Sequence, residues 1–218
     1  MSKGNIYGEI FSTRAIVVKD FISFNEQPYT LNFPMTLSST TLFDNITLHI
    51  ENIIKTKQLE FDRICGTSIS SLPYATNVAT SFEKPICYIK NTGNDITEKQ
   101  NIKNLKIEGG MEIGDKLLLI ETVCTNDFYI ENIIAKIRKY GGEVIGIIVI
   151  LNICEGEYVN LLSGGENVYP ILNLFDIFTH LENNNLIEMF YSEKIKFYCE
   201  RETKTNIKKL ANTKNTVS

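Results

Sequence analysis

Short apolar runs alternate with polar loops and amphipathic stretches through the middle of the chain. The runs at 60–65, 85–90, 116–121 and 143–151 have the length of buried strands. The last of them is nearly continuous in Ile and Val, which is typical of a central strand in a parallel sheet that is covered on both faces. This rhythm of strand, loop and helix predicts an α/β fold with a central parallel sheet flanked by helices.

Helical periodicity fills the segments between these runs. Ile130, Ile133, Ile134 and Ile137 recur at three- and four-residue spacing, basic residues follow in the last turn, and Gly141-Gly142 ends the segment. An earlier unit has a polar loop at 66–71 and a helix at 73–82, with Pro73 in its first turn. The pattern also predicts a strand at 15–18 and helices at 42–55, 174–181 and 186–198; the rest of the first 58 residues is less legible.

Length and composition favour one folded domain. With 218 residues and 43% apolar residues, the chain can bury a core without disulfides or metals. We expect a single domain over residues 1–200 and a polar, disordered tail at 201–218. A formal net charge of −4 argues against a protein that binds the nucleic-acid backbone, which usually presents a basic face.

Cysteine spacing and the start of the chain predict an intracellular protein. The five cysteines include no C-x-x-C pair, so they fit neither a disulfide framework nor a zinc site, and we expect a reducing compartment. Residues 1–11 contain no apolar segment like that of a signal peptide, and the longest apolar run, 145–151, is too short to span a bilayer. We therefore expect a cytoplasmic protein with no membrane partner. Frequent Asn, Ile and Lys indicate an AT-rich genome, such as that of a parasite, a symbiont or a large virus.

Several separated motifs resemble one enzyme family. The segment FDRICGTSISSLPYAT at 61–76 resembles the pyrophosphate-loop region of orotate phosphoribosyltransferases, including the domain fused into UMP synthase. The resemblance continues in IEG at 107–109, GDKLLLIE at 114–121, ILN at 150–152 and the segment 168–181. Phe21 with Pro28-Tyr29 is similar to the family's N-terminal hood. The resemblance implies a type I phosphoribosyltransferase fold with a small N-terminal hood, and an ancestral reaction that makes orotidine monophosphate from orotate and phosphoribosyl pyrophosphate (PRPP) in pyrimidine biosynthesis.

The PRPP loop of the family matches residues 121–128 only in part. The family has two acids that hold the ribose hydroxyls, then a hydroxyl and glycine stretch that wraps the 5′-phosphate. Glu121 and Thr125 match, but the second acid is Thr122 and the glycine is Asp127. The alternative reading makes Thr125 or Asn126 a helix cap and Asp127 a favourable acid in the first helical turn.

The family's other charged loops are also altered. In the pyrophosphate loop, Ser70 stands where the family often has lysine or another polar donor. The vestigial loop comprises Gly66, Thr67, Ser68, Ser70 and Ser71. Its backbone N–H groups could still bind an anion, or it is an ordinary serine-rich turn that Ser71 caps.

The catalytic loop of the family keeps only Lys90 of its basic cluster. Ile89 stands at the family's arginine position and Gly93 at its second lysine position. Asp95 stands where the family has histidine or tyrosine. Three lysines follow in the same stretch, Lys99, Lys103 and Lys106. They either replace the lost cations or belong to a solvated charged loop. The family's arginine after the central strand aligns with Ile153, and the basic stretch of the hood is missing between residues 21 and 28.

No other catalytic set replaces these residues. His49 and His180 lie within predicted helices and read as ordinary helix residues, and Cys124 reads as a small buried apolar residue. The sequence predicts no metal site. The catalytic set is therefore not intact, with Lys90 and Glu121 as vestiges.

Three hypotheses follow from this pattern. The first is a catalytically inactive, orotate phosphoribosyltransferase-like scaffold or regulatory partner without a cofactor, which forms a homodimer or binds another protein through residues 73–90 and 21–33. The second is a divergent active enzyme that uses Mg²⁺ and PRPP. The third is a nucleotide or phosphosugar sensor, whose basic tail would contact nucleic acid through Arg201, Lys204, Lys208, Lys209 and Lys214.

Overall fold

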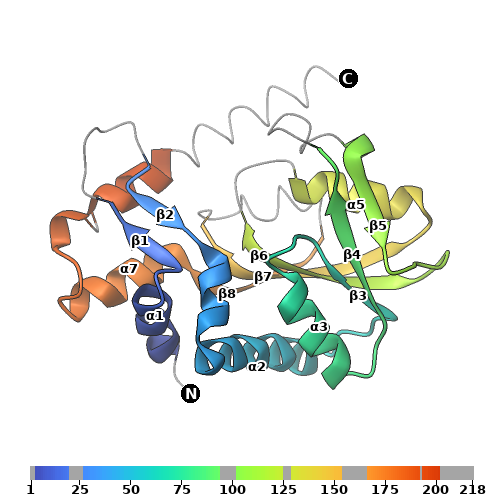
Figure 1. Cartoon of the computed structure of the whole chain (residues 1–218), viewed down its shortest axis with the longest axis horizontal. Coiled ribbons are helices and arrows are strands. Elements are labelled where there is room, and N and C mark those ends of the chain that lie inside the picture. The colour runs from blue at the N-terminus through green and yellow to red at the C-terminus, as the bar shows by residue number, and fades with distance from the viewer. Residues whose placement is uncertain are drawn as a thin grey trace.

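A six-stranded sheet forms the centre of the molecule. The computed structural model describes residues 3–19, 27–93, 102–124, 129–153, 166–191 and 193–201. The strand order is β5-β4-β3-β6-β7-β8, and every neighbouring pair is parallel except β4 with β5 (Figure 1). The four predicted strands are confirmed as parallel neighbours. The strands are β3 (Arg63–Gly66), β4 (Ile86–Asn91), β5 (Leu105–Glu108), β6 (Lys116–Cys124), β7 (Glu143–Asn152) and β8 (Val168–Asn173).

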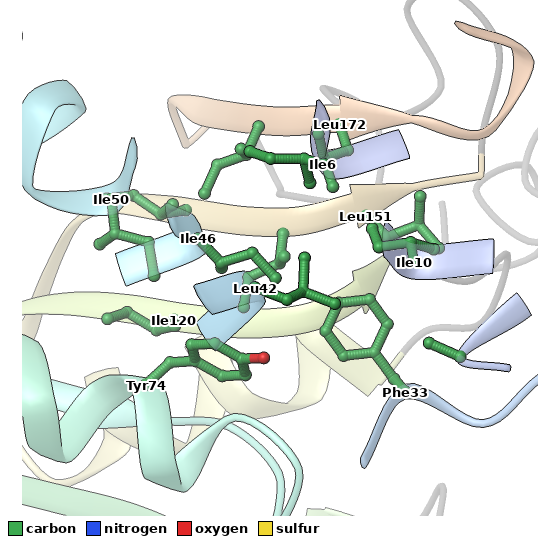
Figure 2. Packing of buried hydrophobic residues seen from close by; sticks show 14 of the residues in the cluster. Ile6, Ile10, Phe33, Leu42, Ile46, Ile50, Tyr74, Ile120, Leu151 and Leu172 are labelled. Atoms are coloured by element: carbon green, nitrogen blue, oxygen red, sulfur yellow. The ribbon is translucent and has the colours of Figure 1, made fainter. Parts of the chain in front are cut away.

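Helices cover both faces of this sheet, as the apolar runs predict. Leu118 and Ile120 of β6 belong to a core on the side of α2 (Thr40–Lys57) and α3 (Leu72–Ser81), whereas Leu117 and Leu119 face α5 (Tyr129–Lys139). Alternate residues of a strand point to opposite faces, so a strand between two layers must be apolar at every position. Figure 2 shows the first core, with side chains of α2 packed over strands of the sheet.

The helices agree closely with the periodicity. The helices α2, α3, α5 and α7 (Leu174–Asn183) each lie within a few residues of their predicted bounds. The predicted helix at 186–198 is wrong at its start, because helical residues are 189–191 and 193–201. The sequence pattern did not reveal α1 (Lys3–Ser12), the short 3-10 helices η1 (Phe33–Ser38) and η2 (Ile102–Asn104), or β5.

A small antiparallel hairpin forms the N-terminal hood. Strands β1 (Ile16–Val18) and β2 (Tyr29–Leu31) pair beside the main sheet, and Ile16 lies opposite Leu31. Tyr29 is buried in the first core. The Thr36 hydroxyl, just after the hood, lies 2.6 Å from the Tyr74 hydroxyl of α3. The predicted strand at 15–18 is confirmed, but Phe21 lies outside the described residues.

The motifs FD at 61–62 and GDK at 114–116 meet at the start of β3 and β6. The Lys116 backbone N–H donates to Asp62 Oδ2 at 2.9 Å, and the Asp62 N–H donates to the Lys116 carbonyl. Arg63 Nε donates to Asp115 Oδ2 at 3.0 Å. These family-like residues therefore fasten two central strands together at the end of the sheet opposite the loops that follow those strands.

Two absences can be stated for the described residues. None of their helices is long and apolar enough to cross a membrane. The cysteines among them, Cys65, Cys87, Cys124 and Cys199, are all buried, and no disulfide joins any two of them.

Candidate functional site

The loop after β3 lies against the end of β6. Gly66, the last residue of β3, pairs with Ile120 in the parallel register, so Thr67 to Ser71 face the last residues of β6. In open α/β sheets, ligands bind outside the carboxyl ends of the strands. The structure thus brings together the two segments that the resemblance assigns to pyrophosphate and ribose binding.

Glu121 is the centre of a hydroxyl cluster at this edge. Its side chain is only 5% exposed. Its Oε2 lies 2.6 Å from Thr67 Oγ1, and its Oε1 accepts from Ser68 Oγ at 3.1 Å and from the Thr122 backbone N–H at 2.6 Å. Within the described part of the chain, no lysine or arginine forms an ion pair with it. The carboxyl group is therefore held by neutral donors alone.

Burial favours a protonated Glu121, whereas the hydrogen bonds that it accepts favour its ionised form. The Thr67 hydroxyl has one proton but lies near two acceptors, the Ile120 carbonyl at 2.9 Å and Glu121 Oε2. If Thr67 donates to Ile120, the short contact with Glu121 needs a proton on the carboxyl group. Burial raises the pKa of Glu121 above its ordinary value and outweighs the hydrogen bonds from Thr67, Thr122 and Ser68, which lower that pKa.

Further hydroxyls extend the cluster from Glu121 across the loop. Ser70 Oγ lies 2.8 Å from Thr122 Oγ1 and 3.1 Å from Ser68 Oγ. The Tyr129 hydroxyl, at the start of α5, donates to the Thr67 carbonyl at 2.8 Å. Sequence reasoning missed Tyr129, because a tyrosine at a helix start carries no signal for a partner more than sixty residues away.

The interpretation of Ser71 as a cap is wrong in its chemistry. Ser71 occupies the residue before α3, but its side chain makes no bond to the helix. Instead its hydroxyl donates to the Ser68 carbonyl at 2.9 Å and accepts from the Ser68 N–H at 3.0 Å. Ser71 therefore closes the loop on itself, and Pro73 lies in the first turn of α3 as expected.

Lys90 lies on a neighbouring strand, apart from the Glu121 cluster. It is exposed and pairs in register with Lys106 of β5, also exposed. Ile89, at the family's arginine position, is buried in the α5-side core. Directly opposed like charges disfavour strand pairing, so this pair of lysines needs an anion or solvent to offset their repulsion.

The other residues singled out in the sequence lie in the cores, in helices or outside the described residues. Ile153 is partly buried against both cores, so an apolar side chain suits its place. His49 and His180 lie in α2 and α7, and Cys124 is buried, as predicted. Thr125, Asn126, Asp127, Asp95 and Lys99 lie outside the described residues.

The described donors do not fit a magnesium pyrophosphate. Mg²⁺ prefers ionised carboxylates and substrate phosphates as oxygen ligands. Among its described residues, the site offers one carboxyl group, already hydrogen-bonded, and Thr122 where the family has a second acid. Across the described residues, no group of three or more His, Cys, Asp or Glu side chains could hold a metal ion.

Sequence comparison identifies relatives with one shared name. The chain matches no protein-family model. Orotate phosphoribosyltransferase of Pyrococcus abyssi is 28% identical over 120 residues, which are 55% of this chain and 63% of that relative. The enzyme of the same name from Legionella pneumophila is 29% identical over 66% of this chain and 70% of its own length. That from Thermococcus gammatolerans is 21% identical over 83% and 94%.

Solved structures show the same fold over most of the chain. UMP synthase of Leishmania donovani superposes with a TM-score of 0.72 at 16% identity, covering 92% of this chain and 43% of that protein. Orotate phosphoribosyltransferase of Aeropyrum pernix gives 0.67 at 18% identity, covering 84% and 99%. This chain therefore has the type I phosphoribosyltransferase fold, and its sequence is similar to those of orotate phosphoribosyltransferases.

Proposed function

We propose that the chain is a catalytically inactive member of this fold that acts as a scaffold or regulatory partner. The observation that carries the proposal is the state of Glu121. The single acid that matches the family's PRPP loop is buried, and both of its oxygens are bonded to hydroxyl and N–H groups of the chain itself. An acid in this state is not available to hold the hydroxyls of a ribose.

The loss of cations supports the same reading. Phosphoribosyl transfer expels pyrophosphate, so an active site must spread negative charge onto preorganised cations or donors, each worth about 3 kcal/mol. Ile89 and Ile153 occupy two of the family's basic positions, and both pack into apolar cores. Loss of several such cations together would leave a very low rate of phosphoribosyl transfer.

Turnover is the direct test of this proposal. We expect purified protein with Mg²⁺, orotate and PRPP to form no orotidine monophosphate. Glu121→Gln should change nothing in that assay, because the carboxyl group does no chemistry. Turnover of the wild type at about one per second or faster, an ordinary enzymatic rate, would show that the proposal is wrong.

A divergent active enzyme is the second candidate, which the Lys90–Lys106 pair favours. Two exposed cations side by side could bind a diphosphate in place of the family's missing basic loop. If so, Lys90→Ala and Lys106→Ala should each lower kcat/KM by at least about tenfold, whereas Lys84→Ala, an exposed lysine before β4, should not. Under the scaffold proposal there is no activity to lower.

The scaffold proposal also assigns a contact surface to α3. A hollow of about 710 Å³ lies along this helix, and its lining includes Phe43, Leu72 and Thr76. Ile69, at its edge, is 89% exposed. Ile69 lines the hollow together with Phe43, Leu72 and Pro73, and apolar side chains gathered in this way favour an apolar partner. This supports the expectation that the region 73–90 contacts a second copy or another protein.

A further inference from the structure

Two cysteines lie side by side on neighbouring parallel strands. Cys65 of β3 pairs in register with Cys87 of β4, strands that are adjacent in Figure 1. Both side chains belong to the core on the α5 side of the sheet, so they point to the same face. Neighbouring strands lie about 4.7–4.9 Å apart, and the Cα atoms of a disulfide usually lie about 4.4–6.8 Å apart. The two strands therefore hold these cysteines at a separation that a disulfide can bridge.

The two thiols interact within an apolar row of the sheet. The row continues through Leu119 of β6 to Ile147 of β7, and Cys65 and Cys87 are both 0% exposed. A hydrogen bond between the thiols raises the pKa of Cys65 and lowers that of Cys87, which the charge of Arg63 lowers further. Cys87 is therefore the thiol that ionises more readily, and the thiolate is the form of cysteine that reacts with oxidants.

The edge of the sheet gives a route to this buried pair. The strand β4 lies beside β5, an edge strand of four residues. Gly109 follows β5 and lies next to Cys87, since a Cβ at Gly109 would be 3.1 Å from the Cys87 Cα atom. A short edge strand opens more readily than the centre of a sheet, because few buried contacts hold it. Local opening at β5 would admit an oxidant as small as hydrogen peroxide.

We propose that Cys65 and Cys87 form a reversible oxidation site, at which a peroxide produces a disulfide that fastens β3 to β4. The Cys87 thiolate attacks one oxygen of hydrogen peroxide, the O–O bond breaks, and the sulfur becomes a sulfenic acid as hydroxide leaves. The Cys65 sulfur then attacks the Cys87 sulfur, the S–OH bond breaks as the S–S bond forms, and a second hydroxide leaves. The two thiol protons convert both hydroxides to water. Two thiols and one peroxide thus give one disulfide and two waters, and a dithiol reductant reverses the change.

The disulfide would close a loop around part of the candidate site. The segment between the two cysteines contains the loop 66–71 and the whole of α3. Within that loop, the Thr67 hydroxyl lies 2.6 Å from the carboxyl group of Glu121. Oxidation would therefore restrain both ends of the segment that carries the Glu121 contacts and the α3 surface. The proposal does not depend on whether the protein is catalytic.

Thiol counting and peptide mapping of the wild type test the proposal. Denatured protein should contain five alkylatable cysteines before treatment with hydrogen peroxide and, with two of them joined, three after it. Mapping without reductant should give one linked pair of peptides that joins Cys65 to Cys87 of the same chain, and dithiothreitol should restore all five thiols. The Tm of the oxidised protein should exceed that of the reduced protein by at least about 2 °C, because the cross-link restricts the unfolded chain.

Two serine variants separate this pair from the other cysteines. Cys87→Ser should give no linked peptide and no rise in Tm, whereas Cys124→Ser, a buried cysteine of the same core, should behave like wild type. Circular dichroism checks that each variant is folded, and the wild-type map needs no variant. Five thiols remaining after peroxide, a disulfide that joins other cysteines or two chains, or an oxidised wild type with an unchanged Tm would each overturn the proposal.

Discussion

Glu121 is the residue at which this chain departs most clearly from a charged binding site. In the described residues its neighbours are hydroxyls and one backbone N–H, supplied by Thr67, Ser68 and Thr122. A buried carboxyl group without a cation is costly when ionised, and the usual response is a shift of its pKa toward the neutral form. The loop after β3 and strand β6 are thus joined by a carboxyl group whose raised pKa favours its neutral form.

Replacing this carboxyl group by an amide should stabilise the protein at neutral pH. Because burial raises the pKa of Glu121 in the folded state, its contribution to stability is complete below the unfolded-state pKa and is lost as pH rises through the folded-state pKa. Glu121→Gln cannot ionise, so its Tm should exceed that of wild type by about 2–4 °C at pH 8, which corresponds to roughly 1 kcal/mol. Melting curves from pH 4 to pH 8 measure this.

The dependence of this Tm gain on pH distinguishes removal of a buried charge from better packing. The gain in Tm should shrink toward pH 4, where Glu121 of the wild type is protonated. Glu143→Gln, at the exposed start of β7, is the matched control and should show no such trend. A Glu121→Gln variant less stable than wild type at pH 8 would mean that the ionised form is the one the site favours.

The ion pair at the other end of the strands should have the opposite pH dependence. The Glu112 backbone N–H, and after it Arg63, lower the pKa of Asp115. Its contribution to stability is therefore present above the ordinary value of 3.8 and lost as pH falls through the folded-state pKa. Asp115→Asn should lower Tm at pH 7 by about 2–4 °C, a modest effect because solvent screens partly exposed pairs.

Melting at pH 7 and near pH 3 measures that difference. The gap between wild type and Asp115→Asn should narrow at the lower pH, where the carboxylate of the wild type begins to gain a proton. Asp176→Asn, on the outer side of α7, is the control. Equal gaps at both pH values would show that the side chain acts through shape and not charge.

Among the elements, β5 shows what the sequence could not reveal. The strands β3, β4, β6 and β7 are buried on both faces or flanked by helices, so their apolar runs and the helical spacing between them predict the fold. The strand β5 is a four-residue edge strand whose exposed positions include Lys106. A short strand with charged side chains has no apolar run to detect, and its antiparallel direction depends on the turn and loops around it.

The sequence predicted which residues belong to the candidate site, but not how their side chains are arranged. The motifs identified Glu121 and the loop 66–71 as site residues, and the structure shows that they are neighbours, because the ends of adjacent parallel strands meet. Burial of Glu121 and the closure of the loop through Ser71 depend on side-chain geometry that no spacing reports. Tyr129 reaches the loop from α5, which only the packed structure brings close.

Gly109 sets the close approach of β5 to β4. It has a φ of 90°, and a Cβ there would lie 2.8 Å from the Ile86 carbonyl oxygen. The adjacent Gly110 also has a positive φ, of 77°, but a Cβ there would meet nothing within 4 Å. Gly110→Ala should therefore cost only the backbone strain, about 1 kcal/mol.

Gly109→Ala should cost that strain and a clash with backbone besides. We expect it to lower the free energy of unfolding by about 1–3 kcal/mol more than Gly110→Ala does, because β5 must shift away from β4. Urea denaturation of both variants and wild type measures the difference. Equal decreases in the free energy of unfolding of the two variants would show that the close approach of Gly109 to Ile86 does not affect stability.

For the whole molecule, binding of PRPP separates the three candidate functions. A ligand that binds only the folded state stabilises it by about 2.7 kcal/mol at a hundredfold excess over Kd, which is roughly 5–10 °C in Tm for a chain of this size. A sensor and an active enzyme both need this binding, whereas a scaffold does not. We expect no shift with Mg²⁺ and PRPP at millimolar concentration, because Glu121 is closed against its own loop and Ile153 supplies no cation. A shift without turnover would assign the protein to phosphosugar sensing, and a shift with turnover to catalysis.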